Sequence, residues 1–193
     1  MFDEIISLDN LFAAWREFRR GKRGKRDVQA FERKLEDHLY ALHRELEDGT
    51  YVHDPYERFH IFDPKFRIIH KAIVRDRIVH HAIHRVIVPI FDGSFIYDSY
   101  SCRVGKGTHM AVERLRTFAR RVSHEYEGPC WALKCDIRKF FDSMNHEILF
   151  ELLTKRIDCM KTLGLLRSII ESYPPVDKIQ ERERELKVFP SGT

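Results

Sequence analysis

The chain has 193 residues, of which 43% are hydrophobic and 12% aromatic, so it can bury a core and is expected to fold as one domain or slightly more. Its formal net charge is only +4 although 33% of its residues are charged, which makes the distribution of charge more informative than its sum. No apolar run approaches a membrane span, no signal peptide is recognisable, and the four cysteines lack zinc-site or disulfide spacing, so we expect no membrane partner and a cytoplasmic location.

The first 50 residues predict two amphipathic helices joined by a basic loop. Apolar side chains recur at helical spacing from Leu8 to Phe18, and a longer helix is predicted from Asp27, as its N-cap, to a stop at Gly49. Seven basic side chains and one acid, Glu17, lie between residues 16 and 26; the seven are Arg16, Arg19, Arg20, Lys22, Arg23, Lys25 and Arg26. This run predicts a phosphate-binding patch with contacts from Arg19, Arg20, Arg23 and Arg26, and the alternative is a solvated loop between helices.

A β-hairpin and a buried helix are predicted next. Residues 58–62 and 67–71 flank the turn-forming sequence Asp63–Phe66. Paired apolar residues every four positions from Ile78 to Ile87 predict a helix that begins after Arg75-Asp76-Arg77 and ends before Pro89.

Three histidines on this helix, His80, His81 and His84, superficially suggest a metal cluster. No matching acids accompany them, so we interpret them as solvent or RNA contacts on the polar side of the helix.

The second half of the chain predicts three helices and one strand. Thr108 can cap a helix that turns Val112, Leu115, Phe118, Ala119 and Val122 inward, and Gly128-Pro129 ends that segment. Cys130 to Ile137 reads as an apolar strand that presents Asp136 at its end. Asn145 is the predicted cap of a further helix, and Leu163–Ser172 is the last one.

Five of these segments, in this order, resemble blocks of the prokaryotic reverse transcriptases of group II introns, retrons and diversity-generating retroelements. The resemblance covers about Gly49 to Ile157. The five segments are Lys65–Ile69, Arg75–Val79, Pro89–Phe91, Ser99–His109 and Lys134–Asp142.

The resemblance implies an α+β fold that comprises the fingers and the first part of the palm of a right-hand polymerase. It has a helix-rich N-terminus, a β-hairpin, and a palm strand that carries the first catalytic aspartate. The implied regions are an N-terminal helical region with a basic loop (1–50), the fingers (51–104), the start of the palm (105–158) and a fingers and palm continuation (159–193) that stops before the second aspartate motif.

The activity implied by the resemblance is RNA-directed DNA polymerisation with two Mg²⁺ ions. An RNA template, a DNA or RNA primer and a deoxynucleoside triphosphate are the implied partners. Asp136 corresponds to the first catalytic aspartate and the carbonyl of Ile137 to a second metal ligand. The alternative for Asp136 is a hydrogen-bonded aspartate at a strand end.

The resemblance also assigns contacts with the nucleotide and the template. Lys65 and Arg67 match the basic fingertip that folds over the triphosphate. Lys139, Phe140 and Phe141 follow the catalytic strand, with Phe141 under the sugar as a steric gate against a 2′-hydroxyl; the alternative is a pair of core aromatics. The template contacts are Arg103, Lys106 and His109.

One family signature is missing, because no Tyr-x-Asp-Asp sequence occurs. We therefore expect an N-terminal fragment that is inactive by itself, holds Mg²⁺ weakly or not at all, and associates with itself through an open palm edge. A rival hypothesis is a non-catalytic RNA-binding or maturase-like module of a mobile or defence element. A third is an unrelated α+β domain.

Overall fold

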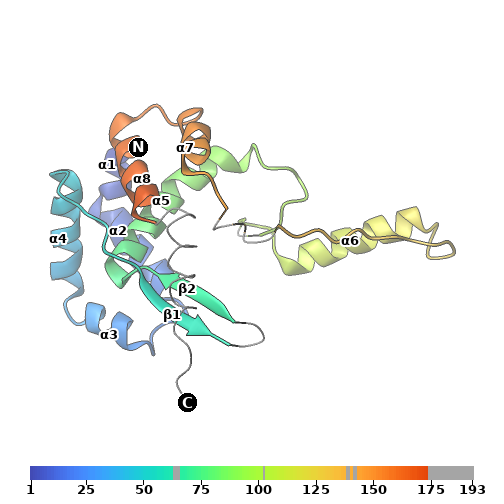
Figure 1. The fold of residues 1–193 in the computed structure, drawn as a ribbon, viewed down its shortest axis with the longest axis horizontal. Coiled ribbons are helices and arrows are strands. Elements are labelled where there is room, and N and C mark those ends of the chain that lie inside the picture. Colours follow the sequence, from blue (N-terminus) through green and yellow to red (C-terminus); the bar gives the residue numbers. More distant parts are fainter. Residues whose placement is uncertain (63–65, 102, 138–139, 141–142, 174–193) are drawn as a thin grey trace, which may run out of the picture. The chain divides into compact units, whose positions relative to one another are not determined.

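The structure, a computed structural model, describes residues 1–62, 66–101, 103–137, 140 and 143–173. The chain divides into two compact units, one formed by Met1–Val88 with Phe141–Thr193 and the other by Pro89–Phe140. The described residues are rich in helix and contain one antiparallel sheet of two strands, which agrees with the predicted α+β class (Figure 1). No helix in these residues is long and apolar enough to cross a membrane.

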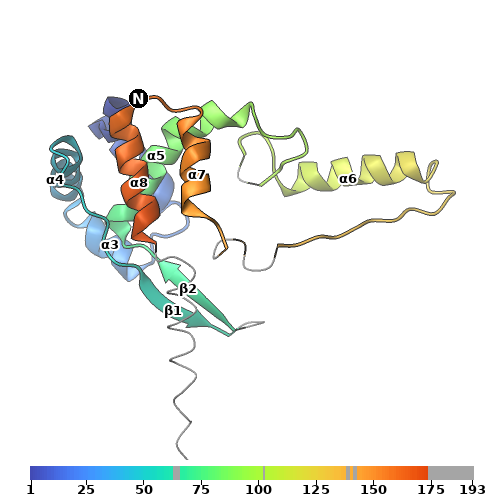
Figure 2. The same cartoon turned by 45° about the horizontal axis from the view of Figure 1, so that its top comes forward.

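The first unit contains most of the regular elements. In chain order they are α1 (Phe2–Ile6), α2 (Leu8–Arg19), α3 (Arg26–Glu32), α4 (Leu35–Glu47), β1 (Glu57–Ile61), β2 (Arg67–Lys71), α5 (Val74–Asp92, up to Val88), α7 (His146–Thr154) and α8 (Met160–Ser172). The two views show helices gathered around α5, with the hairpin projecting away from them (Figure 1, Figure 2).

The core of the first unit is formed by the apolar stripes of its helices. Ile78, Val79 and Ala82 of α5 are fully buried, as the paired spacing predicts. Large side chains of α2 and α4 join them, including Phe18 and Leu39. Each buried Val, Leu, Ile or Phe side chain among them stabilises the fold by roughly 1.5–3 kcal/mol relative to its exposed state.

The single helix predicted from Asp27 to Gly49 is wrong, because α3 and α4 are separate helices that break at Lys34 (φ −130°, ψ 43°). Asp27 is not the cap either, since Lys25 occupies that position. The stop at Gly49 is confirmed: its φ of +71° lies in the left-handed region that glycine tolerates, and the N–H groups of residues 50 and 51 donate to the carbonyl of Glu45.

Helix α5 differs from the prediction at both ends. It begins at Val74, before the Arg75-Asp76-Arg77 sequence, and it continues through Pro89 to Asp92. The proline removes one N–H donor without ending the helix, and the boundary between the two units falls at this residue.

The helices near the C-terminus agree with their predictions. The Asn145 side chain accepts hydrogen bonds from the N–H groups of Glu147 (2.9 Å) and Ile148 (3.1 Å), which confirms it as the cap of α7. The predicted last helix is α8, which begins three residues earlier, at Met160.

The second unit contains α6 (Thr108–Val122). Its apolar side chains are predicted to face a core, and this prediction is wrong. No residue of α6 is buried, and Val112, Leu115, Phe118 and Val122 are all exposed. Gly107, not Thr108, is the cap residue. The spacing correctly predicts an amphipathic helix, but no described element of this unit covers the apolar face.

The strand predicted from Cys130 to Ile137 is also absent. These residues have no regular structure, and Trp131 and Leu133 are 93% and 91% exposed. A strand needs a neighbour for its backbone hydrogen bonds, and within the described residues the only paired strands are β1 and β2.

Candidate nucleic-acid interface

The basic loop between α2 and α3 forms a compact series of turns. The N–H of Lys22 donates to the carbonyl of Arg19 (3.0 Å), and that of Lys25 donates to the carbonyl of Lys22 (3.0 Å). Gly21 adopts a φ of +68°, which favours glycine. The Lys22 ammonium donates to the carbonyl of Phe18 (2.8 Å) and lies over its ring, so this lysine is held against the core.

The side chains of the loop fall into two groups. Arg19, a predicted phosphate contact, instead forms an ion pair with Glu32 of α3 (2.6 Å). Five exposed cations form no ion pair in the part of the chain that the structure describes; they are Arg16, Arg20, Arg23, Lys25 and Arg26. Their uncompensated charge makes the loop suited to phosphate.

The Arg75-Asp76-Arg77 sequence, in the first turn of α5, contacts α3, α4 and the segment that follows α4. Asp76 is fully buried, and its carboxylate accepts from the Tyr51 hydroxyl (2.9 Å) and from the Asp54 N–H (3.0 Å). Burial and the adjacent carboxylate raise the pKa of Tyr51, which keeps the phenol protonated as a donor.

The two arginines of this sequence reach in different directions. Arg75 pairs with Glu45 of α4 (2.7 Å), and Arg77 pairs with Asp27 of α3 (2.8 Å). Burial opposes ionisation of Asp27, but hydrogen bonds from Lys71 and Arg77 prevail and lower the pKa of its carboxyl. The hairpin, α3 and α5 are thereby held together at one carboxylate, which fixes where the basic loop lies.

The histidines of α5 do not form a metal site, because no group of three or more His, Cys, Asp or Glu side chains in the described residues is arranged to hold one. The His80 ring is not solvated as predicted but stacks on His53 (centroids 5.2 Å apart). His84 is exposed, and the His81 ring contacts Phe18 edge-on.

Acidification is expected to destabilise the first unit through His80. Burial, followed by the neighbouring His53, His81 and Arg77, lowers its pKa to about 4. The unfolded chain therefore takes up this proton from about pH 6.5 downward while the folded chain does not, so stability falls as pH drops from 6.5 toward 4. Between pH 7 and pH 5 the loss from this group is roughly 2 kcal/mol.

Urea unfolding at pH 7 and pH 5 measures this loss. His80→Gln, which does not titrate, is expected to lose roughly 2 kcal/mol less than the wild type between the two pH values. Equal losses in both proteins would show that His80 does not contribute.

The hairpin pairs Glu57 with Lys71 and Ile61 with Arg67 in antiparallel register. Arg67, a predicted triphosphate contact, is exposed near the tip. Lys65, the other predicted fingertip residue, lies outside the described residues. The predicted hairpin is confirmed, whereas its contact with nucleotide stays a prediction.

In the second unit, Arg103 organises the loop before α6. Its guanidinium donates to the Asp92 carboxylate (2.7 Å) and to the carbonyls of Ile96 (3.1 Å) and Ser99 (3.3 Å). The guanidinium of this predicted template contact is therefore occupied by hydrogen bonds within the second unit. The Lys106 ammonium lies over the ring of Tyr97 (4.2 Å from the centroid), which is 67% exposed.

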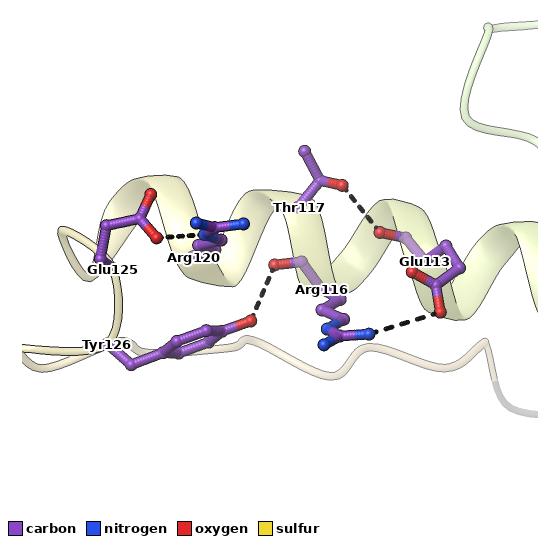
Figure 3. A pocket seen from close by; sticks show the side chains of 6 residues that line it. All are labelled: Glu113, Arg116, Thr117, Arg120, Glu125 and Tyr126. Atoms are coloured by element: carbon purple, nitrogen blue, oxygen red, sulfur yellow. Dashed lines mark hydrogen bonds and ion pairs between the residues drawn. The ribbon is translucent and has the colours of Figure 1, made fainter.

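The predicted contact His109 is exposed in the first turn of α6. Further along, α6 and the turn that follows form a pocket of about 520 Å³ (Figure 3). Tyr126 lies along the helix there, beside Arg116 and Arg120. Arg120 pairs with Glu125, and Arg116 is 3.8 Å from Glu113, so the charge of the pocket is largely balanced.

The predicted catalytic segment is open to solvent. Asp136 is exposed, and the Ile137 side chain is 63% exposed. Phe140 is exposed in a turn, whereas Lys139 and Phe141 lie outside the described residues. Two Mg²⁺ ions need several carboxylate ligands, and the described residues gather no such set, so by themselves they do not fit a two-ion site.

Sequence reasoning missed two features of this interface. The first is the Asp76 network, because Tyr51 and Asp54 lie more than 20 residues before their partner. The second is a cluster of exposed aromatic rings on the hairpin that includes Phe62 and Phe66. Phe62 directly follows β1 and Phe66 directly precedes β2, so the predicted hairpin brings the two rings together and is the signal that was available.

Similarity to known proteins points in one direction, although no protein-family model matches the chain. Group II intron-encoded protein LtrA of Lactococcus lactis is 24% identical over 140 residues, which cover 71% of this chain and 22% of LtrA. Protein YkfC of Escherichia coli is 28% identical over 136 residues, covering 69% of this chain and 35% of YkfC.

A plant protein is similar to this chain at a comparable level of identity. Nuclear intron maturase 1 of Arabidopsis thaliana is 25% identical over 101 residues, covering 52% of this chain and 13% of the maturase. The chain thus matches about an eighth to a third of the length of these curated relatives. The chain is therefore a distant homologue, at low identity, of group II intron-encoded reverse transcriptases and maturases, the class that its sequence resembles.

Proposed function

We propose that this chain binds RNA, as part of a protein of the reverse transcriptase and maturase class. The observation that carries the proposal is the basic loop, where five exposed cations form no ion pair in the described part of the chain. Relatives encoded by or named for introns support RNA as the polyanion. A cluster of unpaired cations on a folded scaffold attracts phosphate without distinguishing sequence.

Binding of a labelled 12-nucleotide RNA, followed by fluorescence anisotropy over a range of salt concentrations, tests the proposal. The logarithm of the association constant is expected to fall linearly with the logarithm of salt concentration, by about 0.7 per phosphate contact. Affinity that is absent at low salt, or that does not respond to salt, would contradict it.

The polymerase function is the more specific form of the proposal. In a complete enzyme of this class Asp136 would be a magnesium ligand in template-directed nucleotidyl transfer, with primer and deoxynucleotide as further partners. The sequence blocks around Asp136 support this role. The rival is a non-catalytic RNA-binding or maturase-like module, and relatives that are named maturases support it.

Asp136→Asn separates the two functions. In the complete enzyme we expect it to lower magnesium-dependent extension of a primer on an RNA template by about a hundredfold or more, because an amide binds a hard cation much less well than a carboxylate. RNA affinity should stay within about twofold, since this residue is not a phosphate contact.

The matched control is Asp158→Asn, which changes another exposed aspartate and should leave extension unchanged. Extension that survives in Asp136→Asn removes this residue from the catalytic site. A complete protein that contains this chain and binds RNA without extending a primer favours the non-catalytic function.

A further inference from the structure

The two faces of the hairpin differ in composition. Side chains of a strand alternate between faces, and paired residues share a face. The pairing of Arg58 with His70 and of His60 with Ile68 therefore puts Arg58 and His60 on one face. The opposite face carries the pairs of Phe59 with Ile69 and of Glu57 with Lys71.

The face with His60 ends in a cluster of three rings that we call the aromatic face: His60, Phe62 and Phe66. The Phe62 and Phe66 centroids are 5.4 Å apart, and the His60 ring lies 5.3 Å from Phe66 and 6.5 Å from Phe62. Phe62 is 75% and Phe66 58% exposed. Such rings bury more than 150 Å² each when covered, so leaving them in water is costly and calls for a partner.

The charge around these rings indicates the chemistry of that partner. Arg58 is exposed on the same face, whereas Arg67, which pairs with Ile61, is exposed on the opposite face. Glu57 is on the other face, where it pairs with Lys71 (3.2 Å). The described residues of the aromatic face thus combine flat rings with a cation and contain no acid. Planar apolar groups on a negatively charged backbone, which describes unpaired nucleobases, complement this combination.

We propose that the aromatic face is a stacking platform for unpaired bases of single-stranded RNA. This inference rests on the proposed RNA binding and deepens it: the basic loop holds phosphates, and Phe62 and Phe66 hold bases. Stacking tolerates any base, because each has a π-face, so the platform adds affinity for single strands without reading sequence.

Two probes of equal length and charge isolate the contribution of the bases. One is a labelled 12-nucleotide oligouridine, and the other is the same phosphodiester chain without bases. The wild-type chain is expected to bind oligouridine about tenfold or more tighter than the abasic chain. Phe62→Leu combined with Phe66→Leu, which keeps apolar volume and removes the rings, should bind the two probes equally.

The matched control is Phe59→Leu, because Phe59 is an exposed aromatic of the same hairpin but lies on the opposite face. It should keep the wild-type preference for oligouridine, and circular dichroism checks that all variants fold alike. The salt dependence of the double variant should equal that of the wild type, since no phosphate contact is removed.

The outcomes distinguish the inference from the proposed function. A double variant that keeps the wild-type preference, or a Phe59→Leu variant that loses it equally, overturns the stacking platform while salt-dependent RNA binding stands. A wild-type chain that binds neither probe overturns both. Preference lost only in the double variant supports the platform.

Discussion

Asp76→Ala is expected to lower the free energy of unfolding by about 3 kcal/mol, the largest stability change we predict for a single residue. The substitution removes the acceptor of two hydrogen bonds in a fully buried place, from the Tyr51 hydroxyl and the Asp54 N–H. Each donor left buried without a partner costs about 1–3 kcal/mol. The cost exceeds that of a surface change because water cannot replace the lost acceptor.

Two further variants make this measurement specific. Tyr51→Phe removes only one donor of the network and should cost about 1 kcal/mol. Asp158→Ala, at an exposed aspartate, should stay within about 0.5 kcal/mol of the wild type. Urea unfolding of the three variants gives the values, and a loss below about 1 kcal/mol for Asp76→Ala would show that the network does not hold the unit together.

Elements specified by local chemistry were predicted well. The hairpin, α2, the Asn145 cap and the stop at Gly49 depend on residues within a few positions of one another, and the structure confirms each. The break between α3 and α4 is different. Leu35 follows Phe31 at a spacing that continues a helix, whereas the Lys34 backbone departs from helical geometry. The carboxylate of Asp27 contacts Lys71 and Arg77, more than 40 residues away, so its role was not visible in the local pattern.

Elements that depend on long-range partners were predicted poorly. The residues from Cys130 to Ile137 have the composition of a strand, but a strand forms only beside another strand. Likewise, the spacing of α6 indicates an apolar face without telling what covers it, and the described residues leave Leu115 and Val122 exposed. Periodicity predicts the type of an element; its burial depends on the rest of the fold.

The candidate interface was predicted in part. The density of positive charge in the sequence predicts the basic loop, but it does not predict that Arg19 forms an ion pair with Glu32 of the next helix. The nucleotide contacts assigned by resemblance stay predictions, and Lys65, Lys139 and Phe141 lie outside the described residues. Arg103 is an informative case, because its block is expected to touch the template, whereas its guanidinium donates to Asp92 at the end of α5 and to the Ile96 carbonyl of its own loop.

Replacing three free cations of the basic loop is expected to produce the largest change in RNA affinity. In the variant that combines Arg20→Gln, Arg23→Gln and Arg26→Gln, each substitution removes an exposed positive charge that pairs with no acid among the described residues. Loss of three phosphate contacts should make the slope of log association constant against log salt concentration shallower by about 2. It should also weaken binding at low salt by about a hundredfold. The fold should be unaffected, because none of the three side chains is buried.

A control of equal charge separates the loop from the total charge of the protein. It combines Arg44→Gln, Lys155→Gln and Arg156→Gln, which also remove three exposed cations from the first unit. If binding reflected net charge alone, the two triple variants would lose affinity equally.

The most direct test of RNA binding by the basic loop is therefore the slope of log association constant against log salt concentration for a 12-nucleotide RNA. It is measured for the wild type and for both triple variants. We predict a slope that is shallower by about 2 in the loop variant and equal to the wild-type slope in the control. A loop variant with the wild-type slope, or a control that changes as much as the loop variant, would contradict the account.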